Sequence, residues 1–201
     1  MKEYATTLPG GDTDLAYLTE GTPEFETYLA DLLWAQDYAR QNREAMMNAV
    51  LGELGTVAGG LKERRRINCH HNYTARERHS GKTFWVTRKG AIRAEKGDAG
   101  VIPGSMGTNT FIVRGLGNPE SFNSSAHGAG RRMSRTRAKR ELSAETLREK
   151  MGGRAWLADR ADRLVDEHPD AYKDIDQVMR FQADLAAIEV ELHQVLNYKG
   201  T

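Results

Sequence analysis

The fold is decided by two stretches in the middle of the chain, Thr83-Phe84-Trp85-Val86-Thr87 and Thr110-Phe111-Ile112-Val113. Both are rich in β-branched and aromatic residues, and glycine, proline and asparagine flank them, which is typical of short β-strands. Glycine is frequent in the loops between and after them, where it permits tight turns and a close approach of the backbone to a ligand. We therefore predict short strands joined by glycine-rich loops.

A long helix is predicted before these strands. Thr22 can cap it, Pro23 suits the first helical position, and Glu24 favours the positive end of the helix dipole. Apolar residues then recur every three to four positions as far as Leu54, and Gly55 follows. This spacing predicts one amphipathic helix over residues 23–54.

Helical patterns return after the strands. Ser143 can cap a helix that Gly152-Gly153 ends, and a short helical pattern covers residues 155–167. Apolar residues on one face predict a further helix over residues 171–195. The order of helix, strands and helices indicates an α+β fold, with short strands and glycine-rich loops flanked by long helices.

The net charge of +1 conceals three segments of different sign. Residues 1–60 carry 3 Lys/Arg against 10 Asp/Glu (net −7), residues 61–140 carry 18 against 5 (net +13), and residues 141–201 carry 8 against 13 (net −5). We therefore divide the chain into a helical segment, a basic strand-and-loop segment that would hold the active site, and a second helical segment. A basic segment suggests a site for a nucleotide or nucleic acid, and pairing of these charges within one fold is the alternative.

Composition excludes several classes of protein. The 201 residues, 28% charged and 39% hydrophobic, fit one globular domain or a large part of one. A single cysteine, Cys69, excludes an internal disulfide and favours a reducing, cytoplasmic compartment. No apolar run is long enough to span a membrane, and Met1–Tyr4 lacks the apolar core of a signal peptide.

Two groups of residues suggest ligand binding. Asn68–Tyr73 contains adjacent histidines, which point in different directions, so that one of them could face a metal ion. Pro103–Thr110 is rich in glycine, serine and threonine, whose N–H and hydroxyl groups can hold a phosphate. The alternatives are a buried structural histidine and an ordinary tight turn.

Two further groups suggest chemistry on phosphates. His127 lies among small residues, and arginines that can bind phosphate oxygens bidentately follow it at once. Such a histidine suits acid–base catalysis or a covalent phosphorus–nitrogen intermediate, although a basic helix start on the surface is equally consistent. Lys199 follows apolar residues that could dock the chain's end at a site, or it is a solvated charge.

These motifs occur together in one protein family. In order they are NCHHNY (68–73), VTRKGA (86–91), PGSMGT (103–108), HGAGR (127–131) with Met133-Ser134-Arg135, AYKDID (171–176) and Lys199-Gly200. Together they closely resemble RtcB, the family of GTP-dependent RNA-splicing ligases. Asp14–Tyr17 and Trp34–Ala39 are similar as well. The resemblance covers nearly the whole chain and implies the C-terminal portion, about half, of an RtcB-like ligase domain.

The resemblance implies an enzyme of tRNA splicing or RNA repair. Such ligases join RNA ends with a 3′-phosphate or 2′,3′-cyclic phosphate to 5′-hydroxyl ends, using GTP and manganese. A histidine accepts guanylate from GTP and passes it to the RNA 3′-phosphate, and the 5′-hydroxyl then displaces it. The matching histidine here is His127. The implied partners are RNA, as tRNA halves or broken ends, and an archease-like activator.

The resemblance also implies the residues of the site. His71 would bind metal and, with Asn72, lie beside the nucleotide, whereas Arg131 and Arg135 are candidates for binding RNA phosphates. The other nucleotide-binding residues that it implies are Pro103, Gly104, Ser105, Met106, Thr110, His127, Gly128, Ala129, Gly130, Tyr172 and Lys199.

The chain departs from the family in one respect. The family's two-metal site takes an aspartate, a cysteine and two further histidines from an upstream half, and no motif here matches them. We therefore expect an incomplete manganese site and weak or absent ligation by this chain alone. Two alternatives stay open: a non-catalytic module that binds RNA or nucleotide, and one half of a split ligase that assembles with a separate N-terminal half.

Overall fold

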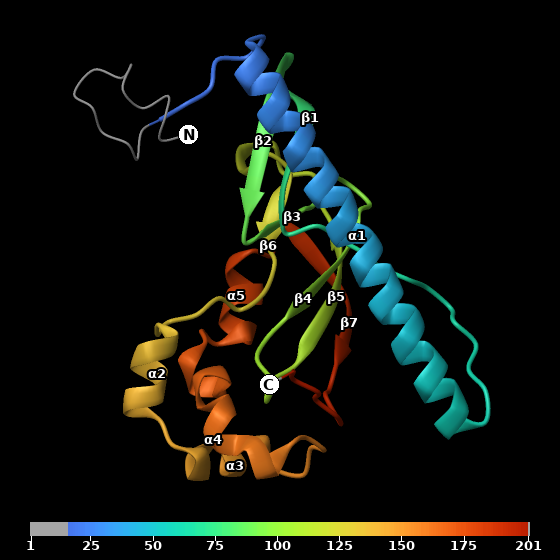
Figure 1. The fold of residues 1–201 in the computed structure, drawn as a ribbon, viewed down its shortest axis with the longest axis vertical. Helices are drawn as coiled ribbons and strands as arrows, with labels where there is room; N and C mark the ends of the chain where they lie inside the picture. Colours follow the sequence, from blue (N-terminus) through green and yellow to red (C-terminus); the bar gives the residue numbers. More distant parts are fainter. Residues whose placement is uncertain (1–15, 201) are drawn as a thin grey trace. The chain divides into compact units, whose positions relative to one another are not determined.

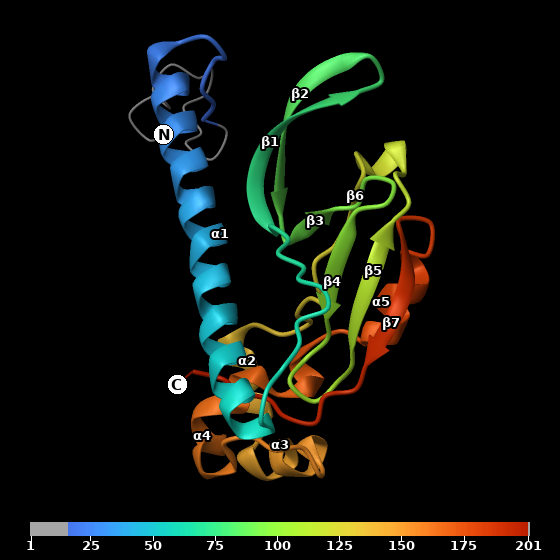
Figure 2. The ribbon, with the colours of Figure 1, turned by 90° about the vertical axis from the view of Figure 1, so that its right-hand side faces the viewer.

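The computed structural model of the chain describes residues 16–200. Asp14 and Leu15, the first two residues of the family-like stretch Asp14–Tyr17, lie outside the described residues. Backbone contacts divide the chain into two units, Met1–Lys62 and Glu63–Thr201. The first unit contains helix α1, and the second contains the strands and the other helices of the described part (Figures 1 and 2). Residues 63–201, which include most of the basic segment and the whole C-terminal segment, fold together as one unit.

Helix α1 spans Pro23–Ala58 and begins where the sequence predicts. Thr22 Oγ1 accepts a hydrogen bond from the Phe25 N–H at 3.3 Å, which satisfies a donor of the first turn. The predicted end at residue 54 is wrong by four residues, because Gly55 remains helical. The helix ends instead at Gly59, whose φ of 69° lies in the left-handed region that glycine adopts without strain.

Three small antiparallel sheets form the centre of the second unit. They pair β1 (Asn72–His79) with β2 (Lys82–Lys89), β3 (Ala91–Arg93) with β6 (Ser124–Ala126), and β4 (Ala99–Pro103) with β5 (Thr110–Gly115) and β7 (Ala186–Leu192). The strands predicted at 83–87 and 110–113 are confirmed as β2 and β5. Helices combined with small antiparallel sheets agree with the predicted α+β class.

The predicted helix over residues 171–195 is wrong. Helix α5 spans only Ile175–Phe181, and Ala186–Leu192 forms strand β7 against β5. Residues 188–192, Ile-Glu-Val-Glu-Leu, alternate apolar and acidic side chains with the period of a strand. The pairing also satisfies the backbone groups along one edge of β5. The segment 141–201 is therefore not helical throughout.

Short helices follow the first strands of this unit. They are α2 (Arg135–Glu141), α3 (Ala144–Met151) and α4 (Ala161–Leu164), and short 3₁₀ turns flank α4 within residues 158–167. Ser143 caps α3 as predicted, through a reciprocal capping box with Thr146, and Gly152 ends it. Both views place α3 and α4 at one end of the second unit and the β1–β2 ribbon at the other (Figures 1 and 2). No helix of residues 16–200 is long and apolar enough to cross a membrane.

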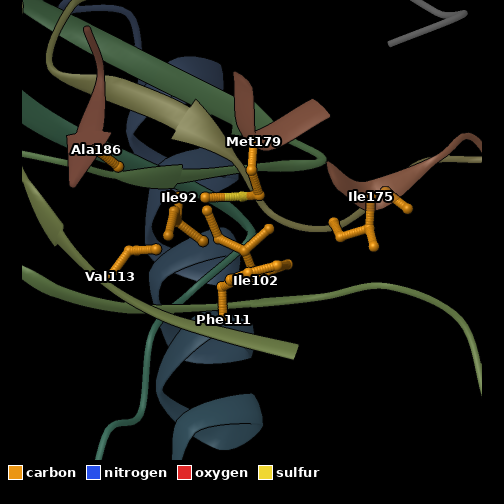
Figure 3. Close-up of a cluster of buried hydrophobic side chains, with 8 residues drawn as sticks. Ile92, Ile102, Phe111, Val113, Ile175, Met179 and Ala186 are labelled. Carbon is orange, nitrogen blue, oxygen red and sulfur yellow. The ribbon is translucent and has the colours of Figure 1, made fainter. Parts of the chain in front are cut away.

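Two buried clusters hold this unit together. The larger one contains side chains from β3, β4, β5, α5 and β7 (Figure 3): Ile92, Ile102, Phe111, Val113, Ile175, Met179 and Ala186, with Ala129 of the HGAGR segment. The smaller one contains Met106 of the PGSMGT loop, packed against α3 and α4 through Leu147, Met151, Ala161 and Leu164. Ala129 and Met106 thus anchor both loops of the predicted site in hydrophobic cores.

Candidate active site

His71 and His127 lie side by side although they are far apart in the sequence. Their rings stack with centroids 5.4 Å apart and 5° between the planes. Gly90 connects them: its N–H donates to the His71 carbonyl oxygen at 2.8 Å, and its carbonyl oxygen lies 2.6 Å from His127 Nδ1. The same N–H donates to Asn72 Oδ1 at 2.9 Å. We call these four residues the histidine cluster.

The contact with Gly90 selects one nitrogen of His127 for chemistry. A carbonyl oxygen only accepts hydrogen bonds, so Nδ1 is the donor in this contact. In the neutral ring the lone pair then lies on Nε2. The imidazole is thereby held in one orientation with Nε2 as its nucleophilic or metal-binding atom.

The PGSMGT loop is closed by its own side chains. The Ser105 N–H donates to Thr108 Oγ1 at 2.6 Å, and the two hydroxyl oxygens are 3.0 Å apart. Gly104 must be glycine, because a Cβ there would lie 2.2 Å from Thr108 Oγ1 and 2.7 Å from the Asn109 carbonyl oxygen. Ser105 and Met106 are both buried. The loop is therefore rigid, and Met106 serves as its anchor in the core.

The HGAGR segment is fixed on the start of this loop. The Ala129 N–H donates to the Pro103 carbonyl oxygen at 3.0 Å, and a Cβ on Gly128 would lie only 3.0 Å from that same oxygen. Gly130, with a φ of 71°, accepts at its carbonyl oxygen from the Lys173 N–H at 2.9 Å. Thr110 opens β5 directly opposite Pro103. The backbone thus brings the predicted nucleotide-binding residues of both loops together.

A second group of predicted residues meets around a buried carboxylate. Glu167 Oε2 accepts from the Tyr172 hydroxyl at 2.5 Å and lies 3.0 Å from Lys199 Nζ. Glu167 Oε1 and Asp166 Oδ2 each accept from Arg135 Nη1 at 2.5 Å. Asp166 and Glu167 are 7% and 5% exposed.

Arg131 joins the same group. Its Nη1 donates to the Tyr172 hydroxyl at 3.0 Å, and its Nη2 donates to the Asp166 carbonyl oxygen at 2.6 Å. Its guanidinium also lies over the Tyr172 ring, 4.8 Å from the centroid. We call Arg131, Arg135, Asp166, Glu167, Tyr172 and Lys199 the arginine–carboxylate cluster. The HGAGR segment connects this cluster to the histidine cluster.

Burial and neighbouring groups shift three pKa values in the arginine–carboxylate cluster, and hydrogen bonds to Asp166 and Glu167 raise that of Arg135. Burial alone would raise the pKa of Glu167, but the hydrogen bonds from Tyr172 and Lys199, the charge of Lys199 and the bond from Arg135 outweigh it and hold that pKa below its ordinary value. Burial, together with the neighbouring Glu167, raises the pKa of the Tyr172 phenol above its ordinary value. Glu167 is therefore ionised and Tyr172 neutral at physiological pH.

Two cavities adjoin these residues. One of about 410 Å³ is lined by the end of the PGSMGT loop, by Tyr172 and Lys173, and by the basic side chains of Arg132, Lys150 and Arg154. The other, of about 250 Å³, is lined by Arg135, Lys139, Arg163, Glu167 and Lys199. Aspartates line both cavities as well, Asp170, Asp174 and Asp176 in the first and Asp166 in the second, so the walls are of mixed charge.

Sequence reasoning missed Asp166 and Glu167, because the charge pattern directed the search for a site to the basic segment 61–140. Adjacent acidic residues after the apolar pair Leu164-Val165, inside a short helical pattern, were the available cue. Both carboxylates are buried next to four predicted site residues, namely Arg131, Arg135, Tyr172 and Lys199. The guanidinium groups of Arg131 and Arg135 form hydrogen bonds with other residues of the chain.

The described residues do not complete a manganese site by themselves. His71 lies beside His127, but within residues 16–200 no group of three or more His, Cys, Asp or Glu side chains is placed to hold a metal ion. The arrangement fits a reactive histidine with phosphate-binding groups nearby.

Comparisons with known proteins show the family of this chain. A family model described as "tRNA-splicing ligase RtcB" matches residues 1–200. The chain is 47% identical to the RNA-splicing ligase RtcB of Escherichia coli K12 over all of this chain and 50% of that protein. It is 32% identical to the RNA-splicing ligase RtcB of Mycobacterium bovis, over 89% of this chain and 45% of that protein. It is 30% identical to the tRNA-splicing ligase RtcB of Aeropyrum pernix, over 89% of this chain and 42% of that protein. The chain spans about half the length of the curated relatives it matches, and it belongs to the RtcB family.

Proposed function

We propose that this chain carries the guanylate-accepting histidine of an RNA ligase, and that this histidine is His127. The observation that carries the proposal is the contact of His127 Nδ1 with the Gly90 carbonyl oxygen at 2.6 Å, which orients Nε2 as the reactive atom. Family membership supports the ligase reaction.

The proposed reaction has three transfers. His127 Nε2 attacks the α-phosphorus of GTP, so that a nitrogen–phosphorus bond forms as the bond to pyrophosphate breaks. The RNA 3′-phosphate, present from the start or formed from a 2′,3′-cyclic phosphate, then takes the guanylate from His127. Finally the 5′-hydroxyl of the second RNA attacks the activated phosphate, guanylate leaves, and the hydroxyl proton passes to water.

Nucleotide binding is assigned to both clusters. His71 stacks on His127, and Asn72 is bonded to the Gly90 N–H. The start of the PGSMGT loop contacts the HGAGR segment through the bond from the Ala129 N–H to the Pro103 carbonyl oxygen. Thr110 adjoins this group through β4, and Tyr172 and Lys199 belong to the arginine–carboxylate cluster. The absent side chains of Gly104 and Gly128 let the PGSMGT loop and the HGAGR segment pack closely. The N–H groups of Gly104, Ser105 and Ala129 donate within the chain and hold this arrangement in place.

Manganese is proposed as the metal of the reaction, with His71 as one ligand. A divalent ion would offset negative charge on the phosphoryl oxygens. The remaining ligands would come from the portion of the relatives that this chain does not span, supplied in the same polypeptide or by a separate N-terminal half.

RNA is the proposed partner of the basic residues. Arg131 and Arg135 are assigned to RNA phosphates, since Arg135 has a side chain 62% exposed and arginine suits bidentate phosphate binding. The substrates would be tRNA halves or broken RNA ends in the cytoplasm, with an archease-like activator as a further partner.

The test is joining of a 3′-phosphate RNA to a 5′-hydroxyl RNA with GTP and Mn²⁺. The chain is assayed alone and with the part of the E. coli relative outside the matched region supplied in trans. We expect joining by the mixture, weak or no joining by the chain alone, and no joining with His127→Ala, which should bind RNA almost unchanged. His193→Ala, at an exposed histidine, is the matched control. Joining that survives His127→Ala refutes the proposal, and RNA binding without joining in every sample favours a non-catalytic module.

A further inference from the structure

We propose that Glu167 is a positioning residue, which holds Tyr172 and Lys199 in place for the guanine nucleotide and links them to the RNA-binding Arg135. This inference rests on the proposed function, because that function assigns these side chains to nucleotide and RNA. It concerns a buried carboxylate that itself belongs to neither assignment.

The geometry gives Glu167 three charged or hydroxyl donors. Tyr172 and Lys199 share Oε2, at 2.5 Å and 3.0 Å, and Arg135 donates to Oε1 at 2.5 Å. Tyr172 follows Glu167 by five residues in the sequence, with Pro169 between them, and Lys199 lies near the C-terminal end of the described residues. A single side chain therefore fixes groups from three separate segments.

An ionised carboxylate is required at this position. Both of its oxygens accept from donors, so an amide in its place would direct an NH₂ group at one of these donors. Glu167→Gln therefore removes the charge and creates a donor–donor contact in a buried site. We expect Tyr172 and Lys199 to lose their fixed positions, while the histidine cluster keeps its own hydrogen bonds.

Asp166 provides an internal comparison. Its carboxylate accepts from Arg135 at 2.5 Å and lies 3.7 Å from Lys139 Nζ. Within the cluster, Asp166→Asn should therefore disturb only the position of Arg135, which is assigned to RNA. Glu167→Gln should also disturb Tyr172 and Lys199, which are assigned to the nucleotide.

The experiment combines two measurements on four variants. Tyr172 titration is followed by NMR in the chain labelled with ¹³C-tyrosine, with Tyr172→Phe to assign the signal. Guanylate transfer to His127 is followed against GTP concentration in the mixture with the E. coli segment. The variants are Glu167→Gln, Glu167→Asp, Asp166→Asn and Glu149→Gln, the last at an exposed glutamate of α3. Glu167→Asp keeps the charge but shortens the side chain, so it tests position if the glutamine variant fails to fold.

We expect Glu167→Gln to lower the Tyr172 titration midpoint and to raise the half-saturating GTP concentration about tenfold, with the maximal rate changed less than about threefold. Glu167→Asp should show smaller changes of the same sign, and Glu149→Gln none. An unchanged Tyr172 midpoint, or a GTP dependence equal to that of Glu149→Gln, overturns the proposal. If the wild-type mixture forms no guanylate on His127, the proposed function fails, and the Tyr172 midpoint still decides whether Glu167 holds that side chain.

Discussion

Arg88 is the residue that fixes the β1–β2 ribbon to the rest of its unit. It is 3% exposed and donates to both Glu77 oxygens, at 2.6 Å and 2.9 Å, and to Tyr73, Ser124 and the Phe122 carbonyl oxygen. Replacing it would leave the Glu77 carboxylate without its cation. We expect Arg88→Met to lower the free energy of unfolding by about 3–5 kcal/mol in urea titrations. Arg76→Met, at an exposed arginine of the same ribbon, should change it little, and equal effects would contradict this role.

The buried Glu167 and the partly buried Glu77 give the protein a predictable response to acid. Burial opposes ionisation of Glu77, but its hydrogen bonds from Arg88 and His79 prevail, so its pKa, like that of Glu167, lies below the ordinary 4.5. Near pH 4 the unfolded chain therefore binds more protons than the folded chain, and stability falls as pH falls. We expect the urea midpoint to drop between about pH 5 and pH 3. Glu167→Gln should flatten this dependence, and an unchanged slope would show that Glu167 titrates normally.

At the scale of elements, local patterns predict an element well where they are unambiguous. Thr22 and Pro23 begin α1, and the β-rich stretches become β2 and β5. Strand β7 could not be predicted in the same way, because Ile188 and Leu192 also fit the longer helical pattern, and its pairing with β5 is a tertiary contact. Similarly, the burial of Glu167 depends on residues from three segments.

The end of β5 is a test of packing at this scale. A Cβ on Gly115 would lie 2.4 Å from both the Ala94 carbonyl carbon and the Glu95 carbonyl oxygen, which are backbone atoms. We expect Gly115→Ala to destabilise the fold by about 1–3 kcal/mol, measured by urea unfolding. Gly153→Ala, where a Cβ meets nothing within 4 Å, is the control. A Gly115→Ala protein as stable as this control would contradict the close packing of β5 on the Ala94–Glu95 segment.

Across the whole molecule, the segregation of charge along the sequence directs attention to the basic segment, where most of the proposed site residues lie. The histidine cluster and both arginines of the proposed RNA contact lie in the segment 61–140, which has a net charge of +13. The acidic segment that follows, residues 141–201, is part of the same unit, to which it contributes the buried Asp166 and Glu167 and strand β7.

This charge pattern predicts how RNA binding depends on salt. We expect single-stranded RNA to bind more weakly as salt increases, and Arg135→Gln to reduce the slope of log K against log salt by about 0.7, the value for one phosphate contact. Arg180→Gln, at an exposed arginine of α5, should leave the slope unchanged. Equal slopes for both variants would remove Arg135 from the RNA contact.

The proposal that His127 accepts guanylate is tested most directly by tandem mass spectrometry of the chain after incubation with GTP and Mn²⁺. The sample contains the part of the E. coli relative outside the matched region, and the chain alone is run beside it. We expect one guanylate on His127 in the mixture, released by RNA with a 3′-phosphate, and little guanylate on the chain alone. Guanylate on another residue, or none on His127 in a mixture that joins RNA, would contradict the proposal.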